Sequence, residues 1–530
     1  MVIKEGLINS SSVIPAKAGI QKLYDFPGFR LGGPSALGRN DGINQRFLNF
    51  HSPVMRRLVA MVFLSALLLP AAAQAEKAGS ENLPEPVAQA LKRHGLPTRG
   101  LSVYVREIGQ PSPLLAVAAE QPRHPASTIK VLTTLAGLEE LGPAYRWKTE
   151  AYTTAPVRNG RLEGDLYLKG YGDPYLVMEY FWRFLRGLRA AGIEEIAGDL
   201  VLDQSYFARE PGEFDGQTLR AYNVLPNALL VNFQAVNFRF IPQPGASRVH
   251  IFADPLPANL EVVNRVTLSQ APCRGWAHNL GLKLQHQGND TKVIFSGTYE
   301  ADCGDNELFR VVSEPAPYTL GMFKMLWSEL GGRFAGGVRE GRAPEKARLL
   351  HSVDSPPLAG IIRAINKYSN HVRTRQLVLT MGAEKAGPPG TTEGGIQVVR
   401  DWLKRRGLNF PELKLENGAG LSREESISAR HLGEVLLAGW QSPYMPEFIS
   451  SFPISAMDGT LRRRFSGTDM EGQLHLKTGS LNDVRTLAGY VLDQQGRRLI
   501  VVCLHNHAQA DTAAGEAVQK ALLEWVYRRP

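Results

Sequence analysis

The pattern of hydrophobic residues changes twice along this chain, and the two changes limit the folds that it can adopt. "LSVYVREIG" (101–109) and "PLLAVAAEQP" (113–122) alternate apolar and polar residues, which predicts a hairpin of two strands. "HPASTIKVLTTLAGLEELGP" (124–143) then predicts a helix that a Gly-Pro pair ends. From about residue 146 the chain turns to short β-like runs split by Gly, Asn and Pro, and helical periodicity returns only near residue 320.

The C-terminal part of the chain predicts several helices and a second hairpin. "LAGIIRAINKYSNHVRTRQLVLTMG" (358–382) and "SARHLGEVLLAGW" (428–440) have helical periodicity. "VRTLAGYVLDQQGRRLIVVCLHNH" (484–507) predicts two strands with a turn at 493–496, and "AGEAVQKALLEWVYRR" (514–529) predicts a last amphipathic helix that packs on its own sheet. At most, this helix would make a peripheral contact with a membrane.

These patterns together predict an α+β fold. Antiparallel strands flanked by helices form one domain, which we assign to residues 76–145 and 321–530. A mainly β insert, of one or two subdomains, occupies residues 146–320. With 530 residues and 43% hydrophobic composition, the chain can bury the core of two or three domains.

The N-terminal segment predicts export. "MRRLVAMVFLSALLLPAAAQA" (55–75) combines two arginines, a short apolar run and a small-x-small cleavage pattern, which is typical of a signal peptide cut after Ala75. Such a signal normally stands at the N-terminus, so we interpret residues 1–54 as an upstream leader that is not native and Met55 as the true start. A long disordered leader is the alternative. The mature protein is expected outside the cytoplasm.

Charge and cysteine content exclude some functions. The first 75 residues hold eight Lys or Arg and three Asp or Glu, so they supply more than half of the net charge of +9. Basic residues are not interleaved with aromatics, which argues against nucleic-acid binding. Cys273 and Cys303 could form a disulfide in an oxidising compartment, whereas Cys503 lies in an apolar run and is expected to be a buried thiol. Without a Cys-x-x-Cys pair, a zinc-thiolate site is not expected.

A serine and a lysine lie three positions apart at the start of the helix predicted over 124–143. A serine hydroxyl needs a base near neutral pH, and a lysine amine serves as that base only when its pKa is lowered. Ser127 and Lys130 would share one helix face, where the positive end of the helix dipole disfavours the lysine charge. On its own the pattern also fits an ordinary helix start in which Ser127 is the N-cap.

Two further motifs follow in order. "INKYSNHV" contains Ser369, and "LHLKTGS" ends a predicted strand with Lys477, Thr478 and Gly479. The combination of S-x-x-K, S-x-N and K-T-G resembles the penicillin-interacting serine peptidases, in which the three motifs line one cleft. With "NGAGLSR", "MDGTLRRRF" and the long insert after the first motif, residues 82–530 resemble the penicillin-binding protein 4 type of D-alanyl-D-alanine carboxypeptidase and endopeptidase. The resemblance implies a serine β-lactamase/transpeptidase-like domain.

The resemblance also implies roles for single residues. Ser127 would attack the D-alanyl carbonyl, Lys130 would take its proton, and Ser369 would relay a proton toward the leaving amine. The backbone N–H groups of Ser127 and Ser480 would form the oxyanion hole. Lys477 and Thr478 would bind the terminal carboxylate. The lack of a side chain at the glycine of the K-T-G motif, Gly479, would let the backbone approach the substrate.

The second motif departs from the family pattern. In the S-x-N register, His371 stands where an Asn is expected; histidine can donate a hydrogen bond as an amide does, but it has a different shape and titrates near neutral pH. In a rival register, Tyr368-Ser369-Asn370, Tyr368 would be the proton relay. We favour Ser369, because "NKYSN" as a whole fits the carboxypeptidase family.

Three further roles follow from the resemblance. Asp203, in "VLDQSYF", would contact the free amine of a diaminopimelate-like side chain, and Arg423 and Asn482 would line the same pocket. The alternatives are a turn-forming Asp, a surface Arg and a loop Asn.

The function that the resemblance implies is that of a periplasmic serine D,D-peptidase. It would act on peptidoglycan stem peptides and cross-links, would be acylated by β-lactam antibiotics, and would need no metal or organic cofactor. Two alternatives stay open: a β-lactamase-like hydrolase, and a degenerate protein that binds peptidoglycan or senses β-lactams, which only His371 favours. The sequence predicts no oligomeric state.

Overall fold

The computed structural model describes residues 82–210 and 215–529. The leader and the signal peptide predicted over residues 1–75 lie outside the described residues. No helix in the part of the chain that the structure describes is long and apolar enough to cross a membrane.

A five-stranded antiparallel sheet joins the two ends of the chain. Its order is β18-β19-β20-β1-β2. The strands are β1 (Leu101–Glu107), β2 (Leu115–Val117), β18 (Leu474–Leu481), β19 (Val484–Leu492) and β20 (Arg498–Asn506). Both hairpins predicted from the sequence are confirmed, and β1 pairs with β20 along its whole length. The strand that carries the K-T-G motif, β18, lies at one edge of the sheet. Residues 453–455 hydrogen-bond to the outer side of its first residues, 474–476, and within the described residues no strand pairs with that side over 477–481.

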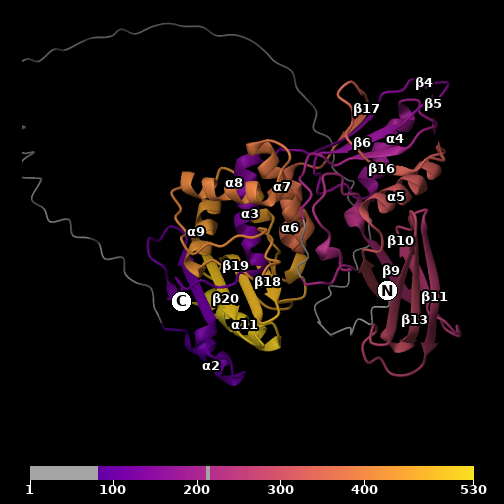
Figure 1. The fold of residues 1–530 in the computed structure, drawn as a ribbon. Helices are drawn as coiled ribbons and strands as arrows, with labels where there is room; N and C mark the ends of the chain where they lie inside the picture. The colour runs from indigo at the N-terminus through magenta and orange to yellow at the C-terminus, as the bar shows by residue number, and fades with distance from the viewer. Residues whose placement is uncertain (1–81, 211–214, 530) are drawn as a thin grey trace, which may run out of the picture. The chain divides into compact units, whose positions relative to one another are not determined.

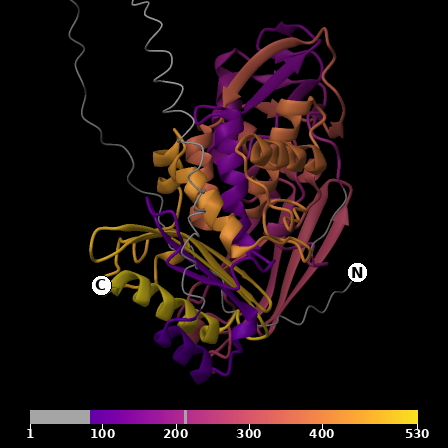
Figure 2. The ribbon, with the colours of Figure 1, turned by 90° about the vertical axis from the view of Figure 1, so that its left-hand side faces the viewer.

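Helices cover both faces of this sheet (Figures 1 and 2). Helices α2 (Glu85–Arg93) and α11 (Ala513–Arg528) pack on one face, with strand residues such as Val103 and Cys503 between them. Helices α3 (Lys130–Leu141) and α9 (Ala429–Trp440) pack on the other face. Successive strand residues point to opposite faces, and residues on both faces of β1 and β20 are apolar, so these strands contribute to both cores. The prediction that the last helix packs on its own sheet is confirmed, as is the buried thiol.

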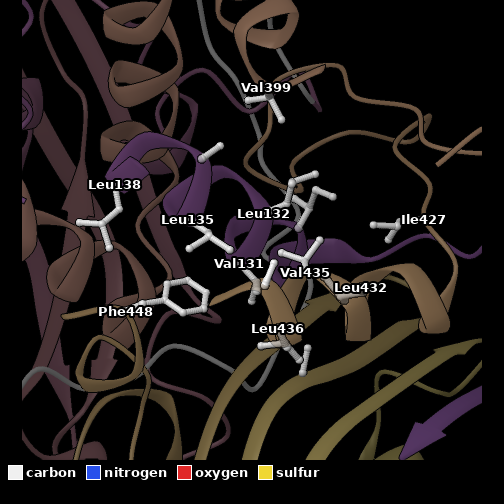
Figure 3. Packing of buried hydrophobic residues seen from close by; sticks show 14 of the residues in the cluster. Val131, Leu132, Leu135, Leu138, Val399, Ile427, Leu432, Val435, Leu436 and Phe448 are labelled. Atoms are coloured by element: carbon white, nitrogen blue, oxygen red, sulfur yellow. The ribbon is translucent and has the colours of Figure 1, made fainter. Parts of the chain in front are cut away.

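Helix α3 lies in the middle of the larger core. Figure 3 shows Val131, Leu135 and Leu138 of α3 packed among side chains of α9 and of α10 (Met445–Ser450), where Val435 and Phe448 are labelled. All of them are buried. Because this helix is enclosed along its length, its first residue, Lys130, is held firmly relative to the sheet.

The stretch 358–382 forms two helices where the sequence predicted continuous helical periodicity. Helix α6 (Leu358–Tyr368) ends at Ser369, which has a left-handed φ of 54°, and α7 (His371–Ala386) begins after it. The Asn370 side chain accepts a hydrogen bond from the backbone N–H of Arg373, which caps α7. The break arises because an Asn N-cap offers the backbone an alternative to a continuous helix. The other helices here are α8 (Thr392–Arg405) and α10 (Met445–Ser450).

In the described residues, the insert is built from four further sheets and two α-helices. The sheet β16-β8-β6-β3-β17 consists of β3 (Lys148–Thr153), β6 (Leu166–Gly170), β8 (Leu200–Asp203), β16 (Val338–Glu340) and β17 (Arg348–Asp354). The sheet β15-β7-β5-β4 consists of β4 (Val157–Arg158), β5 (Arg161–Leu162), β7 (Glu195–Ile196) and β15 (Arg333–Phe334). The two three-stranded sheets consist of β9 (Val236–Ile241), β10 (His250–Asp254) and β14 (Asn306–Arg310), and of β11 (Leu260–Ser269), β12 (Leu280–Gln287) and β13 (Asp290–Glu300). The helices are α4 (Met178–Ala190) and α5 (Pro315–Glu329).

Pairing in the insert continues past residue 320. Strands β16 and β17 pair with β8 and β3, so this sheet takes in residues up to Asp354. The domain limits drawn from the sequence stay a prediction. Cys273 and Cys303 form a disulfide in the insert.

Candidate active site

Ser127 lies in a tight turn directly before α3. The turn is a 3₁₀ helix, η3 (Ala126–Ile129), and Ala126 has a positive φ of 44°. The carbonyl oxygen of Pro125 accepts hydrogen bonds from the hydroxyls of Thr128 (2.6 Å) and Thr486 on β19 (2.7 Å). Only 5% of Ser127 is exposed. The serine is therefore held on a backbone fixed by both the sheet and the helix, which is the rigidity that a nucleophile requires.

Lys130 contacts Ser127 inside the core. Its Nζ is 3.1 Å from the Ser127 Oγ and 3.2 Å from the His371 Nδ1, and it donates to the carbonyl oxygen of Ala419. Lys130 is fully buried. Burial, and then the neighbouring charge of Lys477, hold the pKa of Lys130 well below its usual value. The amine is therefore suited to be neutral and to accept a proton.

The K-T-G strand brings a second lysine to the site. The Lys477 Nζ donates to the Ser369 Oγ (2.9 Å) and to the carbonyl oxygen of Thr478 (2.6 Å). Burial lowers the pKa of Lys477 to about 7. The Thr478 hydroxyl donates to the hydroxyl of Thr460 (2.8 Å). A serine, two threonines and a titratable lysine thus converge at the open edge of β18, where an anion could be bound.

Gly479 lies against Ser127. A Cβ atom there would be 2.9 Å from the backbone nitrogen of Ser127 and 2.2 Å from the Thr486 Oγ1. A side chain at this position would therefore push β18 away from Ser127. The next residue, Ser480, is exposed at the end of the strand. An oxyanion hole formed by the backbone N–H groups of Ser127 and Ser480 stays a prediction.

The break between α6 and α7 decides how the second motif faces the site. Ser369 contacts Lys477, and His371, in the first turn of α7, contacts Lys130. Burial and the charge of Lys130 hold the pKa of His371 well below its ordinary value, so its ring is neutral near pH 7. Tyr368 is 65% exposed. Within the described residues, neither Asn370 nor Tyr368 hydrogen-bonds to Lys130 or Lys477; Asn370 caps α7 instead.

The three residues of the proposed side-chain pocket lie in different surroundings. The Asp203 carboxylate, 1% exposed, accepts hydrogen bonds from the backbone N–H and hydroxyl of Ser205 (3.0 and 2.7 Å) and from the backbone N–H of Ala343 (2.9 Å). These bonds hold a turn of the insert and do not link Asp203 to Ser127. Arg423 and Asn482 are exposed, on the 417–425 loop and in the β18–β19 turn. Their binding roles stay predictions.

Other site residues escaped the sequence analysis. Ala419 supplies a carbonyl oxygen to Lys130, and Thr460 supplies a hydroxyl to Thr478. Both lie in phrases that matched the family pattern, "NGAGLSR" and "MDGTLRRRF", so the signal was present without a role attached to it. Among the described residues, no group of three or more His, Cys, Asp or Glu could hold a metal ion.

The chain is similar to known proteins along almost its whole described length. A model of the D-Ala-D-Ala carboxypeptidase 3 (S13) family matches residues 83–529. The D-alanyl-D-alanine carboxypeptidase of Actinomadura sp. (strain R39) is 29% identical over 500 residues, which cover 89% of this chain and 91% of that protein. The D-alanyl-D-alanine carboxypeptidase DacB of Haemophilus influenzae is 24% identical over 382 residues, which cover 71% of this chain and 79% of that protein.

Solved structures show the same fold. The crystal structure of penicillin binding protein 4 (dacB) from Haemophilus influenzae superposes with a TM-score of 0.69 at 23% identity, covering 84% of this chain and 100% of that chain. The same protein complexed with a β-lactam superposes with a TM-score of 0.67 at 22% identity and the same coverage. The expected α+β fold is confirmed.

Proposed function

Because this chain belongs to the D-Ala-D-Ala carboxypeptidase 3 (S13) family and is a serine peptidase, we propose that it acts on peptidoglycan through an acyl-enzyme on Ser127. As a carboxypeptidase it would release the terminal D-alanine of stem peptides. As a D,D-endopeptidase it would cleave the cross-links between them. The observation that carries the proposal is the contact between the Ser127 hydroxyl and Lys130, a buried lysine whose pKa is well below its usual value.

The partners of Lys130 support its role as the base. A neutral amine has two N–H donors and one lone pair. Two acceptors, the carbonyl oxygen of Ala419 and the Nδ1 of His371, can take the two N–H groups, and the lone pair is left for the hydroxyl of Ser127. His371 thus provides an acceptor for the lysine, which its neutral ring makes possible. A charged ring would offer no acceptor.

Acylation then proceeds in balanced steps. The Ser127 hydroxyl gives its proton to the Lys130 Nζ while the Oγ bonds to the D-alanyl carbonyl carbon. The backbone N–H groups of Ser127 and Ser480 bind the oxyanion. When the C–N bond breaks, the leaving amine takes the proton of the Ser369 hydroxyl, and the protonated Lys477 Nζ, which contacts that hydroxyl, replaces it. Water then hydrolyses the ester: its hydroxide bonds to the acyl carbon and its proton restores the Ser127 hydroxyl. Lys130 releases the proton that it took from Ser127 and Lys477 takes one up from solvent, which returns both lysines to their starting states.

Lys477 and Thr478 would bind the carboxylate of the terminal D-alanine. A protonated Lys477 supplies the charge, and the hydroxyls of Thr478 and Thr460 supply hydrogen bonds beside it. The open edge of β18 would pair with the extended peptide backbone. A β-lactam resembles this terminus, so it should acylate Ser127.

The activity is tested with a peptidoglycan pentapeptide and a cross-linked dimer. We expect the purified protein to release D-alanine and to split the dimer, and Ser127→Ala to abolish both reactions. A protein that only bound peptidoglycan would do neither, and the enzyme proposal would then be wrong. A labelled penicillin adduct on Ser127 that lasts for many minutes would separate this enzyme from a β-lactamase.

The proton relay is tested with two variants. We expect Ser369→Ala to slow acylation strongly, because Lys477 then loses its hydroxyl partner. Tyr368→Phe should acylate normally, since that ring is exposed. The reverse result would assign the relay to Tyr368.

We further propose that the protein works in the periplasm after removal of residues 1–75. The signal-like segment 55–75 supports this, together with the cell-wall substrates that the relatives' names imply. N-terminal sequencing of the protein purified from a periplasmic extract should begin at Glu76.

A further inference from the structure

A buried carboxylate lies beneath the active-site loop. Glu425 is 1% exposed, and its two carboxylate oxygens accept hydrogen bonds from four backbone N–H groups. The donors are Glu416 (3.3 Å), Asn417 (3.0 Å), Gly418 (2.7 Å) and Gly420 (2.9 Å). Burial raises the pKa of Glu425 above its usual value, although the N–H groups of Asn417, Gly418 and Glu416 and the charge of Lys130 act to lower it. Because both oxygens accept, the ionised form is the one that the loop satisfies.

The same loop contacts the nucleophile helix. The carbonyl oxygen of Gly418 accepts a hydrogen bond from the Thr133 hydroxyl (2.6 Å), and the carbonyl oxygen of Ala419 accepts one from the Lys130 Nζ. The 416–420 loop therefore donates its N–H groups to Glu425 and accepts, through two of its carbonyl oxygens, hydrogen bonds from side chains of α3. If the carboxylate moved, the acceptor that orients the Lys130 amine would move with it.

Glu425 is also the negative charge near Lys130. The groups that face this lysine from α7 are His371 and Arg375, and from β18 it is Lys477. The charges of Lys477 and Arg375 lower the pKa of Lys130, while that of Glu425 raises it. The four hydrogen bonds to this carboxylate come from neutral backbone N–H groups, which leave its negative charge uncompensated, so the charge acts on the neighbouring amine.

We propose that Glu425 is a positioning residue for the nucleophile's base: it clamps the 416–420 loop, and so the Ala419 carbonyl, against Lys130, and its charge keeps that lysine able to take up a proton. The inference rests on the proposed acylation of Ser127. It goes beyond the three motifs, because Glu425 belongs to none of them.

The pH dependence of acylation separates this role from a merely structural one. The second-order rate of labelling by a fluorescent penicillin is measured against pH for the wild type, Glu425→Gln, Glu425→Asp and the control Glu424→Gln, whose side chain is exposed. The neutral Lys130 is the active form, so the rate falls as pH drops below its pKa. Removing the negative charge lowers that pKa, so the acidic limb of Glu425→Gln should move to lower pH.

The aspartate variant tests the clamp separately. It keeps the charge but shortens the side chain, so its maximal rate should fall by about tenfold or more while its acidic limb stays near that of the wild type. Thermal unfolding checks that each variant is folded, and the aspartate result stands if the glutamine variant does not fold. The control, Glu424→Gln, should match the wild type in its maximal rate and in the pH of its acidic limb.

Two outcomes would overturn the proposal: an acidic limb in Glu425→Gln that is unmoved or moves to higher pH, or a maximal rate in Glu425→Asp equal to that of the wild type. If instead the wild type is not labelled at any pH, the proposed function itself fails.

Discussion

Replacing Gly420 by alanine should damage both stability and acylation, because two separate costs meet at this residue. Gly420 has a φ of +78°, and an alanine in this left-handed region costs about 1–2 kcal/mol. A Cβ there would also lie 2.1 Å from the carbonyl oxygen of Ala126 and 2.7 Å from the backbone nitrogen of Ser127. Overpacking of this kind costs a further ~1–3 kcal/mol. The free energy of unfolding of Gly420→Ala should therefore fall by about 2–5 kcal/mol.

The two atoms that the new Cβ would contact belong to η3, the turn that holds Ser127. The turn must shift to relieve the contact, and a displacement of about 1 Å at a reacting group costs roughly a hundredfold in rate. Urea unfolding measures the loss of stability. Labelling by a fluorescent penicillin, followed in the absence of urea, measures the loss of acylation rate.

Gly407→Ala is the matched control. Gly407 also has a positive φ, +68°, but a Cβ there would meet nothing within 4 Å. It should lose only the backbone cost of about 1–2 kcal/mol and keep the wild-type acylation rate. If Gly420→Ala unfolded at the same urea concentration as this control and acylated at the wild-type rate, the packing of Gly420 on Ser127 would not constrain the nucleophile, and our reasoning would be wrong.

Three further predictions concern charge and cross-linking. Burial lowers the pKa of Lys477 to about 7, and only its protonated form attracts a carboxylate, so kcat/KM for D-alanine release should fall as pH rises through about 7. A substrate amidated at its C-terminus has no carboxylate, so its kcat/KM should not fall through this pH range. If it falls in the same way, Lys477 does not bind the carboxylate. Asp458→Asn removes the negative charge that the buried Lys367 Nζ contacts at 2.6 Å. Because the lysine then loses its charged partner, the free energy of unfolding, measured with urea, should fall by about 1–3 kcal/mol. An unchanged unfolding midpoint would mean that water replaces the pair. Replacing both Cys273 and Cys303 by serine opens a 30-residue link in the insert and should cost roughly 3–4 kcal/mol in thermal unfolding, with catalysis retained.

Much of the architecture could be predicted from the sequence because it depends on periodicity. Alternating residues in 101–109 and the two apolar runs in 484–507 predicted strands, and both hairpins formed as expected. That both faces of these strands are buried is a finding of the structure. The helical pattern over 358–382 is confirmed, but period alone does not reveal the break at residues 369–370, where Asn370 caps a second helix. The strands after residue 320 that join the insert sheet were also missed, since they pair with segments far away in the chain.

The sequence by itself determined the order of the three motifs and the elements that carry them. Which of their side chains work together was decided by the tertiary structure. The helix break turns Ser369 toward Lys477 and His371 toward Lys130, and "SREES" reads as a polar surface although the structure buries Glu425 within it. The reason is physical: periodicity records which face of an element is apolar, whereas a pKa depends on desolvation and on charges that only folding brings together.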